Sequence, residues 1–194
     1  MKEVVRCWTS ADPSYDVYHD EEWGRPIREE RGLYERLCLE GFQSGLSWLT
    51  ILRKREGFRA AFAGFEPDRV ARYGKRDVDR LLKDAGIVRH RGKIEAAIAN
   101  AKATVALRDS TPLHELFWSY QPEDAPVPRR GEPWHSTTPE SVALAKELRR
   151  RGFRFVGPTT VYAAMQACGV VNDHLAECWV RQAVEAERMV ARAM

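Results

Sequence analysis

The sequence has no long apolar run. No stretch approaches the roughly 20 apolar residues that a membrane-spanning helix needs, and the opening residues, MKEVVRCW, lack the apolar centre of a secretory signal peptide. We therefore expect a cytoplasmic protein without membrane contact. No segment alternates apolar and polar residues cleanly enough to predict a strand, and internal repeats and low-complexity stretches are missing as well.

Cysteine is also scarce, with four residues in a chain of 194. In a reducing compartment this argues against a disulfide framework and leaves metal binding or core packing as the roles of the thiols. Cys38 and Cys168 lie inside apolar helical patterns, which predicts core positions. Cys7 and Cys178 lie near opposite ends of the chain, each with a histidine nearby.

Charge of either sign is not in large excess. The formal net charge is +3, and 44% hydrophobic with 30% charged residues is ordinary for a soluble globular protein. The length allows one well-buried core, arranged as a single domain or as two small lobes. Basic residues gather at 53–59, 89–93 and 149–154. Such runs are usually solvated faces, but three of them favour a polyanionic partner.

Apolar spacing and helix-end residues predict a chain of helices. The stretch 78–85 repeats apolar residues at helical spacing, with Gly86 as its expected C-cap. The stretch 137–152 carries Thr138 as N-cap, Pro139 at the first helical position and Gly152 as the stop. Further helices are predicted at 29–42, 47–63, 93–107, 111–119, 159–168 and 174–192, with a long irregular connection over 120–139.

The two ends of the chain carry the spacing of a metal site. Cys7 and His19 are separated by eleven residues, and His174 and Cys178 form an H-x₃-C pair on a predicted helix, where positions four apart share a face. Two thiolates and two imidazoles make a closed tetrahedral Zn²⁺ site with no position left for water. We therefore predict one structural zinc, which would fasten the N-terminal segment to the last helix.

Aromatic residues and a single acid indicate a pocket. Tyr15 and Tyr18 are one helical turn apart, and Trp23 follows closely. Core packing is the ordinary explanation for such spacing, although the acidic residues around them argue against full burial. In LCLEGFQSGLSW, residues 37–48, Glu40 stands alone among apolar and small residues.

Two glycine-containing turns suit a nucleic-acid backbone. In GFRFVGPTT, residues 152–160, one helix ends and another begins at Gly157. Free backbone N–H groups at such a helix start, with the hydroxyls of Thr159 and Thr160 beside them, can bind phosphate without reading sequence. An ordinary connection between two helices is the alternative. DAGIVRHRGKIEAA, residues 84–97, is the second such stretch.

Four stretches together resemble one family, namely YHDEEWG, LCLEGFQSGLSW, DAGIVRHRGKI and RGFRFVGPTTVYAAMQACGVVNDH. From Arg6 to about Cys178 the chain resembles the 3-methyladenine DNA glycosylase I (constitutive Tag-type) proteins, which are similar to the helix–hairpin–helix DNA glycosylases. The resemblance implies an all-α, two-lobed single domain over 1–194, with its hairpin at about 140–170. Zinc would link the terminal segments 7–19 and 174–178, and an extra helix at about 179–192 has no assigned role.

The resemblance also assigns residues. It places Tyr15, Tyr18, Trp23, Glu40 and Trp48 in the base pocket, Leu46 as the wedge in the duplex, and Cys7, His19, His174 and Cys178 on the zinc. Gly157, Thr159 and Thr160 would hold the DNA backbone. The implied activity is hydrolytic removal of N3-methyladenine from alkylated double-stranded DNA by a monomer, which leaves an abasic site and releases the free base. Glu40 would select the cationic lesion.

The chain departs from the wider superfamily at Phe155, where many hairpins carry glycine. Asp173 competes with Glu40 as the carboxylate that assists bond cleavage, although a structural role beside His174 is equally open. Two other functions fit the same residues. One is a zinc-stabilised DNA-binding module without catalysis, and the other is a glycosylase for a different alkylated purine, such as 3-methylguanine.

Overall fold

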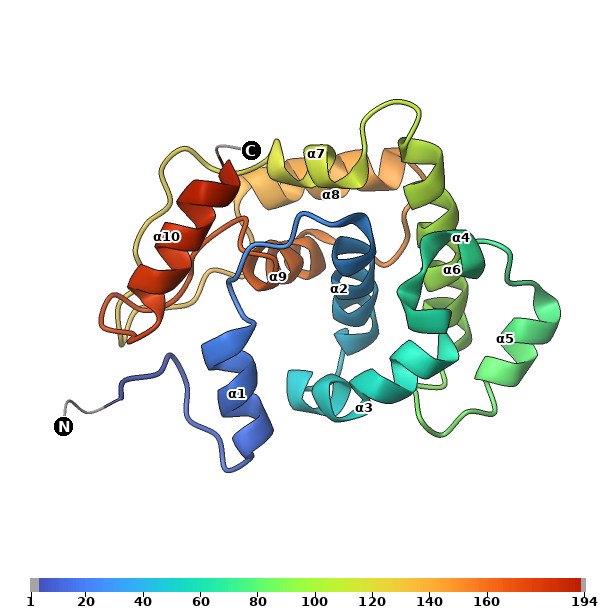
Figure 1. Ribbon diagram of the computed structural model, residues 1–194, viewed down its shortest axis with the longest axis horizontal. Helices are drawn as coiled ribbons and strands as arrows, with labels where there is room; N and C mark the ends of the chain where they lie inside the picture. Colours follow the sequence, from blue (N-terminus) through green and yellow to red (C-terminus); the bar gives the residue numbers. More distant parts are fainter. Residues whose placement is uncertain (1–3, 193–194) are drawn as a thin grey trace.

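The computed structural model describes residues 4–192, and within that range every regular element is a helix (Figure 1). The all-α prediction is confirmed. The elements are α1 (Pro13–Glu21), α2 (Glu30–Gln43), α3 (Trp48–Ala61), the short 3₁₀ helix η1 (Ala63–Phe65), α4 (Pro67–Val70), α5 (Lys75–Leu81), α6 (Arg91–Leu107), α7 (Leu113–Trp118), α8 (Pro139–Arg150), α9 (Pro158–Ala167) and α10 (Arg181–Arg192). None of these helices has both the length and the apolarity to cross a bilayer.

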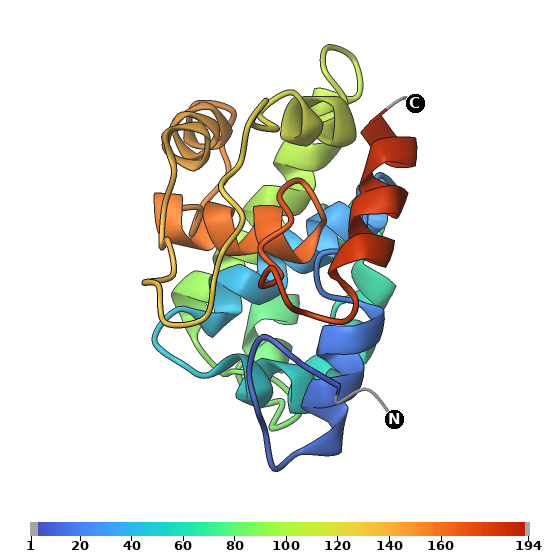
Figure 2. The same cartoon turned by 90° about the vertical axis from the view of Figure 1, so that its left-hand side faces the viewer.

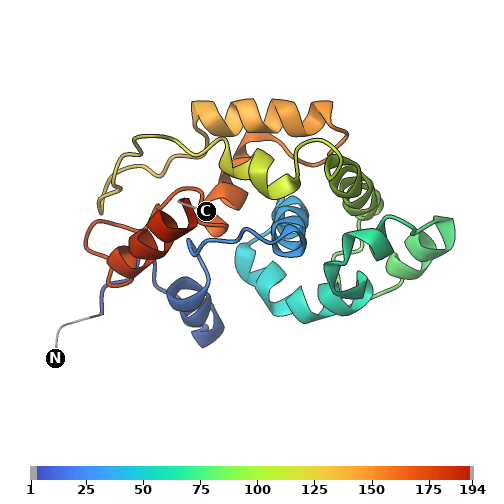
Figure 3. The same ribbon diagram turned by 45° about the horizontal axis from the view of Figure 1, so that its top comes forward.

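Helix α2 lies in the middle of the molecule, between α9 on one side and α6 on the other (Figures 1 and 3). Its residues from Leu37 to Phe42 are all buried, which is why the segment reads as nearly continuous apolar sequence. Helices α8 and α9 pack against each other and are joined by a turn over 151–157. The one acidic side chain of α2 that is buried, Glu40, therefore lies in the interior of the fold.

Several helix ends form where local chemistry predicts them. The Thr138 hydroxyl accepts a hydrogen bond from the Ser141 amide at 3.2 Å, Pro139 is the first residue of α8, and Gly152 has φ +94° just after its end. The C-cap prediction at Gly86 is wrong, since α5 ends at Leu81. The Gly86 amide donates instead to the Asp84 carboxylate at 2.7 Å, a local turn that replaces further helix.

The predicted helix over 174–192 is also wrong in its first part, because α10 begins only at Arg181. The preceding segment is an irregular loop between α9 and α10 (Figure 2). The Arg181 guanidinium donates to the carbonyl groups of Asn172 and His174, which are therefore not paired within a helix. His174 and Cys178 are brought together by this loop and not by a shared helix face.

Candidate functional site

A cavity of about 260 Å³ opens beside α2 and is walled largely by aromatic side chains. All five predicted base-pocket residues line it. The complete lining is Trp8, Tyr15, Tyr18, Trp23, Glu40, Gln43, Trp48, Trp134, His135, Ala163 and Gln166. The volume lies just below the roughly 300–1,000 Å³ of small-ligand sites, and aromatic walls with a few polar groups are their usual composition.

Six aromatic rings of this wall form an unbroken series of neighbours. The centroids of neighbouring rings are separated by 6.2 Å (Trp134–Trp23), 4.8 Å (Trp23–Trp8), 5.3 Å (Trp8–Tyr15), 6.3 Å (Tyr15–Tyr18) and 5.2 Å (Tyr18–Trp48). Planar, polarisable rings on this scale suit a flat aromatic ligand that stacks between them.

Helix α1 places the two tyrosines in the wall. The Asp12 carboxylate caps the helix by accepting from the Ser14 amide at 3.0 Å, and it also pairs with Arg53 of α3 at 2.6 Å. Because Tyr15 and Tyr18 are three residues apart on this helix, they lie on one face, and that face turns toward the cavity.

Glu40 is the only acid in the cavity lining and is 5% exposed. Loss of solvation raises the pKa of its carboxyl to about 8, against the opposing effect of Arg36. Arg36 lies one turn earlier on α2, is itself buried, and has its guanidinium 5.4 Å from the Tyr18 ring and 5.8 Å from the Trp48 ring. The pocket thus combines π-faces with a carboxyl that ionises more readily when a cation enters.

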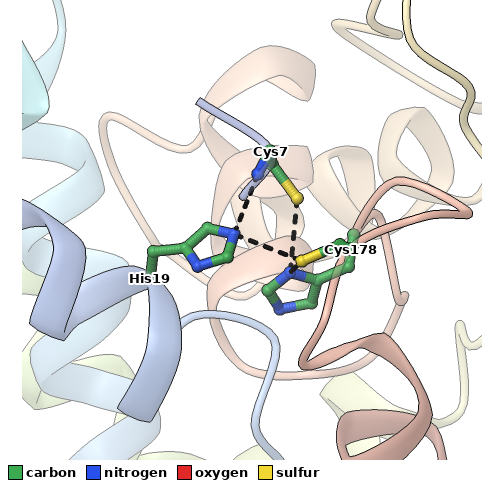
Figure 4. Close-up of side chains that lie close together, drawn as sticks. Cys7, His19 and Cys178 are labelled. Atoms are coloured by element: carbon green, nitrogen blue, oxygen red, sulfur yellow. Dashed lines mark hydrogen bonds between the residues drawn. The ribbon is translucent and has the colours of Figure 1, made fainter. Parts of the chain in front are cut away.

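The four predicted metal ligands converge in a buried cluster. One ligand atom from each of Cys7, His19, His174 and Cys178 lies within 4.8 Å of every other. The Sγ atoms of Cys7 and Cys178 are each 3.4 Å from His174 Nδ1, and Cys178 Sγ is 3.6 Å from His19 Nε2. Figure 4 shows Cys7 and His19 from the N-terminal segment facing Cys178 from the loop before α10.

Hydrogen bonds outside the cluster fix both imidazoles. His174 Nε2 donates to the Trp23 carbonyl at 2.9 Å, and a carbonyl can only accept, so Nδ1 carries the lone pair that faces the thiols. His19 Nδ1 lies 2.7 Å from the Asp20 carboxylate, which likewise leaves Nε2 as the inward lone pair. Such outer partners are typical of metal-binding histidines.

These separations fit a tetrahedral ion. Zinc bonds of about 2.3 Å to sulfur and about 2.0–2.1 Å to nitrogen place sulfur and nitrogen about 3.6 Å apart at a tetrahedral angle, close to the 3.4–3.6 Å found here. Hydrogen bonding from the Cys7 thiol holds the pKa of Cys178 below its usual range. The donor set and its geometry therefore match a closed metal site.

The predicted DNA-contact residues lie on neighbouring turns. Leu46, 42% exposed, is on the turn between α2 and α3, and the buried Lys93 ammonium holds that turn by donating to the carbonyls of Phe42 and Ser44 at 2.9 and 2.5 Å. The turn between α8 and α9 approaches the same place, because the Phe155 ring is 6.1 Å from that of His90 at the start of α6.

Phe155 itself is 41% exposed and has φ +54°, the left-handed region that favours glycine. Glycine would adopt this conformation with less steric strain than phenylalanine does. Gly157 precedes α9, whose first turn holds the exposed Thr159 and the half-buried Thr160.

The basic runs 53–59 and 149–154 form ion pairs within the protein. Arg55 pairs with Glu22, Arg59 with Glu35, and Arg150 and Arg151 with Glu147. These pairs favour the ordinary interpretation of the runs as structural and solvated charges.

Asp173 lies outside the lining of the aromatic cavity. One of its oxygens accepts from the Tyr162 hydroxyl at 2.6 Å and from the Gln166 amide at 2.7 Å. No hydrogen bond joins its carboxylate to the His174 ring among the described residues, and the outer partner of the cluster's other imidazole is Asp20. The Asp173 carboxylate is thus tied to α9.

Sequence reasoning missed several residues that line the cavity and the buried Arg36 behind its wall. Arg36 and Gln43 lie four residues before and three after Glu40, so helical spacing alone could have placed them on its face. Trp8 directly follows a metal-ligand candidate. Trp134 and His135 lie in the irregular connection and carry no periodic signal.

Comparison with known proteins agrees with this geometry. The chain is 49% identical over 180 residues to DNA-3-methyladenine glycosylase 1 of Escherichia coli (strain K12), covering 90% of this chain and 96% of that protein. A crystal structure of 3-methyladenine DNA glycosylase I matches with a TM-score of 0.85 at 47% identity, covering 90% of this chain and 98% of the other. A tyrosine-to-phenylalanine form of 3-methyladenine DNA glycosylase I, solved in complex with 3-methyladenine, matches with a TM-score of 0.84 at 35% identity, covering 89% and 94%.

The model of the methyladenine glycosylase family matches residues 8–182, a range that contains the aromatic cavity and all but one member of the metal-ligand cluster. The resemblance read from the four sequence stretches is confirmed. The chain belongs to the methyladenine glycosylase family.

Proposed function

We propose that the protein removes N3-methyladenine from alkylated double-stranded DNA by hydrolysing the N-glycosidic bond, leaving an abasic site without cutting the strand. The observation that carries the proposal is the buried Glu40 carboxyl inside an aromatic cavity of base-binding size. The names of the matched proteins and the 3-methyladenine bound in one of them support it. The proposed site of action is chromosomal DNA in the cytoplasm.

Recognition follows from the charge of the lesion. A base must leave the stack to be processed, at a cost of a few kcal/mol that is smaller for a damaged base. Adenine methylated at N3 is cationic while attached to the sugar, so the faces of Tyr18 and Trp48 attract it more strongly than neutral adenine. Glu40 accepts a hydrogen bond from the exocyclic amine and balances the ring charge in a site of low dielectric.

Catalysis needs little beyond this binding. The positive charge already weakens the glycosidic bond, and water attacks the oxocarbenium-like sugar that forms. Among residues 4–192 no lysine lines the cavity, and the buried Lys93 ammonium is engaged by two backbone carbonyls, so these residues offer no amine nucleophile of the strand-cutting kind. We propose a monofunctional enzyme in which Glu40 acts on the base.

The turns near α6 and α9 form the proposed DNA face. Leu46 would fill the gap left by the base, and α8, the turn and α9 would act as the hairpin over about 140–170. Gly157, Thr159 and Thr160 would bind phosphate at the start of α9. The proposed active form is a monomer in which 1–194 acts as a single two-lobed domain.

Cys7, His19, His174 and Cys178 are proposed to hold one structural zinc. An ion closed in by four protein ligands takes no part in bond cleavage. Its effect would be to fix α1, and with it Tyr15 and Tyr18, against the loop before α10.

Incubation with methylated duplex DNA, followed by chromatography of the released bases, tests the function. We expect release of 3-methyladenine, retention of 7-methylguanine and an intact strand. The matched control is the Glu40→Gln variant, which should unfold at the same temperature as the parent protein at low pH. Preferential release of another alkylated purine would identify that purine as the substrate. If no base is released, the result would favour a DNA-binding module without catalysis.

A further inference from the structure

One ring of the aromatic wall differs from the others in exposure. Trp134 is 47% exposed, whereas Trp23, Tyr18 and Trp48 are 8%, 3% and 7% exposed. Trp134 contributes to the same cavity, with its ring edge-on to Trp23 at 60°. An indole that is half in solvent at the rim of an aromatic cavity offers apolar surface that a flat ligand would cover.

The segment around Trp134 is held on both sides but has no regular structure of its own. Before it, the Glu132 amide donates to the Arg129 carbonyl at 3.1 Å, and the Arg129 amide donates to the Glu132 carboxylate at 3.1 Å. After it, Thr138 caps α8. The ring is therefore delivered to the cavity rim by a turn and a helix start, while the residues between them can adjust.

The same segment is attached to the metal-ligand cluster. The Ala176 amide donates to the Pro128 carbonyl at 2.8 Å, and Arg130 bonds the Glu177 carboxylate at 3.2 Å and the Arg6 carbonyl at 3.0 Å. These partners flank Cys7 and Cys178. The position of Trp134 thus depends on the segments that also fix α1, so both sides of the cavity share one support.

We propose that Trp134 is a specificity-determining residue that closes over the flipped base and forms the outer wall of the pocket. This rests on the proposed function. The buried rings provide a fixed inner wall, and Trp134 is the ring whose exposed surface and irregular backbone allow it to move onto the base after entry. Tryptophan provides the strongest π-face for a cation, so the closure favours a positively charged purine.

The test compares Trp134→Ala with Trp134→Phe, which keeps an aromatic face. Val127→Ala is the matched control, since Val127 lies on the same segment, is 46% exposed and does not line the base cavity. Binding of free 3-methyladenine is measured by calorimetry, and KM and kcat are measured on methylated duplex DNA. Thermal unfolding confirms that each variant folds.

We expect Trp134→Ala to weaken binding of the free base at least about fivefold, the low end of base–aromatic stacking. Trp134→Phe should recover most of the affinity, and Val127→Ala should match the parent protein. If Trp134→Ala binds the free base as tightly as the parent protein, the inference is overturned. This also holds if the KM of the variant for DNA rises while its affinity for the free base stays unchanged. If the parent protein itself neither binds the free base nor releases it from DNA, the proposed function fails as well.

Discussion

Glu40 is neutral for much of the time in the free protein at pH 7, because burial raises the pKa of its carboxyl to about 8. A cationic base that enters the pocket favours the ionised form, so base binding and deprotonation are coupled. A carboxylate that stayed ionised in this desolvated pocket without a bound cation would destabilise the folded protein more than the neutral carboxyl does. The residue thus becomes charged when the lesion is present.

The same pKa predicts a pH-dependent cost in stability. The folded pKa lies above the value of about 4.3 expected in the unfolded chain, so the folded state binds the proton more tightly. The free energy of unfolding therefore falls as pH rises from about 4.3 to about 8, by up to about 1.4 kcal/mol per pH unit. Glu40→Gln should be increasingly more stable than the parent across this window, and level off above it. Urea unfolding of both proteins at pH 5, 7 and 8.5 checks this, and a difference independent of pH would contradict it.

Glu40 and Asp173 can be separated by their effects on the free base. Glu40→Gln keeps the shape but loses the charge, and losing a charged hydrogen-bond partner costs about 1.5–3 kcal/mol, or about ten- to over a hundredfold in excision rate. Asp173→Asn should leave binding of free 3-methyladenine unchanged, because Asp173 does not line the cavity. Calorimetry with the free base and single-turnover excision distinguish the two.

Normal base binding by Glu40→Gln with abolished excision would make Glu40 a group that acts in bond cleavage and not in recognition. Loss of excision in folded Asp173→Asn alone would move the chemistry to that carboxylate.

At the scale of elements, the turn between α2 and α3 links the pocket to the proposed DNA face. Glu40 lies near the end of α2, Leu46 lies on the turn, and Trp48 begins α3. Lys93 of α6 ties the turn to a third helix. A short stretch of chain thereby supplies the proposed base-binding carboxyl, the proposed wedge and one wall of the cavity.

Leu46→Gly should weaken DNA binding and excision for every substrate alike, because a wedge fills the gap without reading the base. Thr159→Ala should lower DNA affinity independently of sequence, since phosphate contacts carry no sequence information. Filter binding on duplexes of different sequence, together with the ratio of released bases, measures both. A changed ratio of released bases in either variant would contradict this division.

At the scale of the whole molecule, the metal-ligand cluster joins the two ends of the chain. We expect one zinc per chain by elemental analysis. Cys178→Ser should lose the ion and unfold at lower temperature, though by less than the roughly 10–16 kcal/mol that zinc supplies to small peptides, because this fold has a large core. Cys168→Ala, which removes a buried thiol outside the cluster, should keep the ion. Substoichiometric zinc together with a fully stable Cys178→Ser would contradict the site.

Sequence patterns predicted what depends on local spacing. The face shared by Tyr15 and Tyr18, the cap at Thr138 and the buried centre of α2 all follow from helical periodicity and helix-end chemistry. The helix predicted over His174 and Cys178 is a loop, in which the Arg181 guanidinium bonds the carbonyl groups of Asn172 and His174. Trp134 reaches the cavity through an irregular connection, and only tertiary contacts decide where such a segment lies.

The cluster joins residues from the two extremes of the chain, and this bears on when the enzyme becomes active during its synthesis. Cys7 and the α1 residue His19 leave the ribosome early, but the ring and thiol that contact them belong to His174 and Cys178. The tyrosine wall of the pocket is therefore completed only when nearly the whole chain has emerged. A truncated translation product could fold its central helices and still present no closed base pocket to DNA.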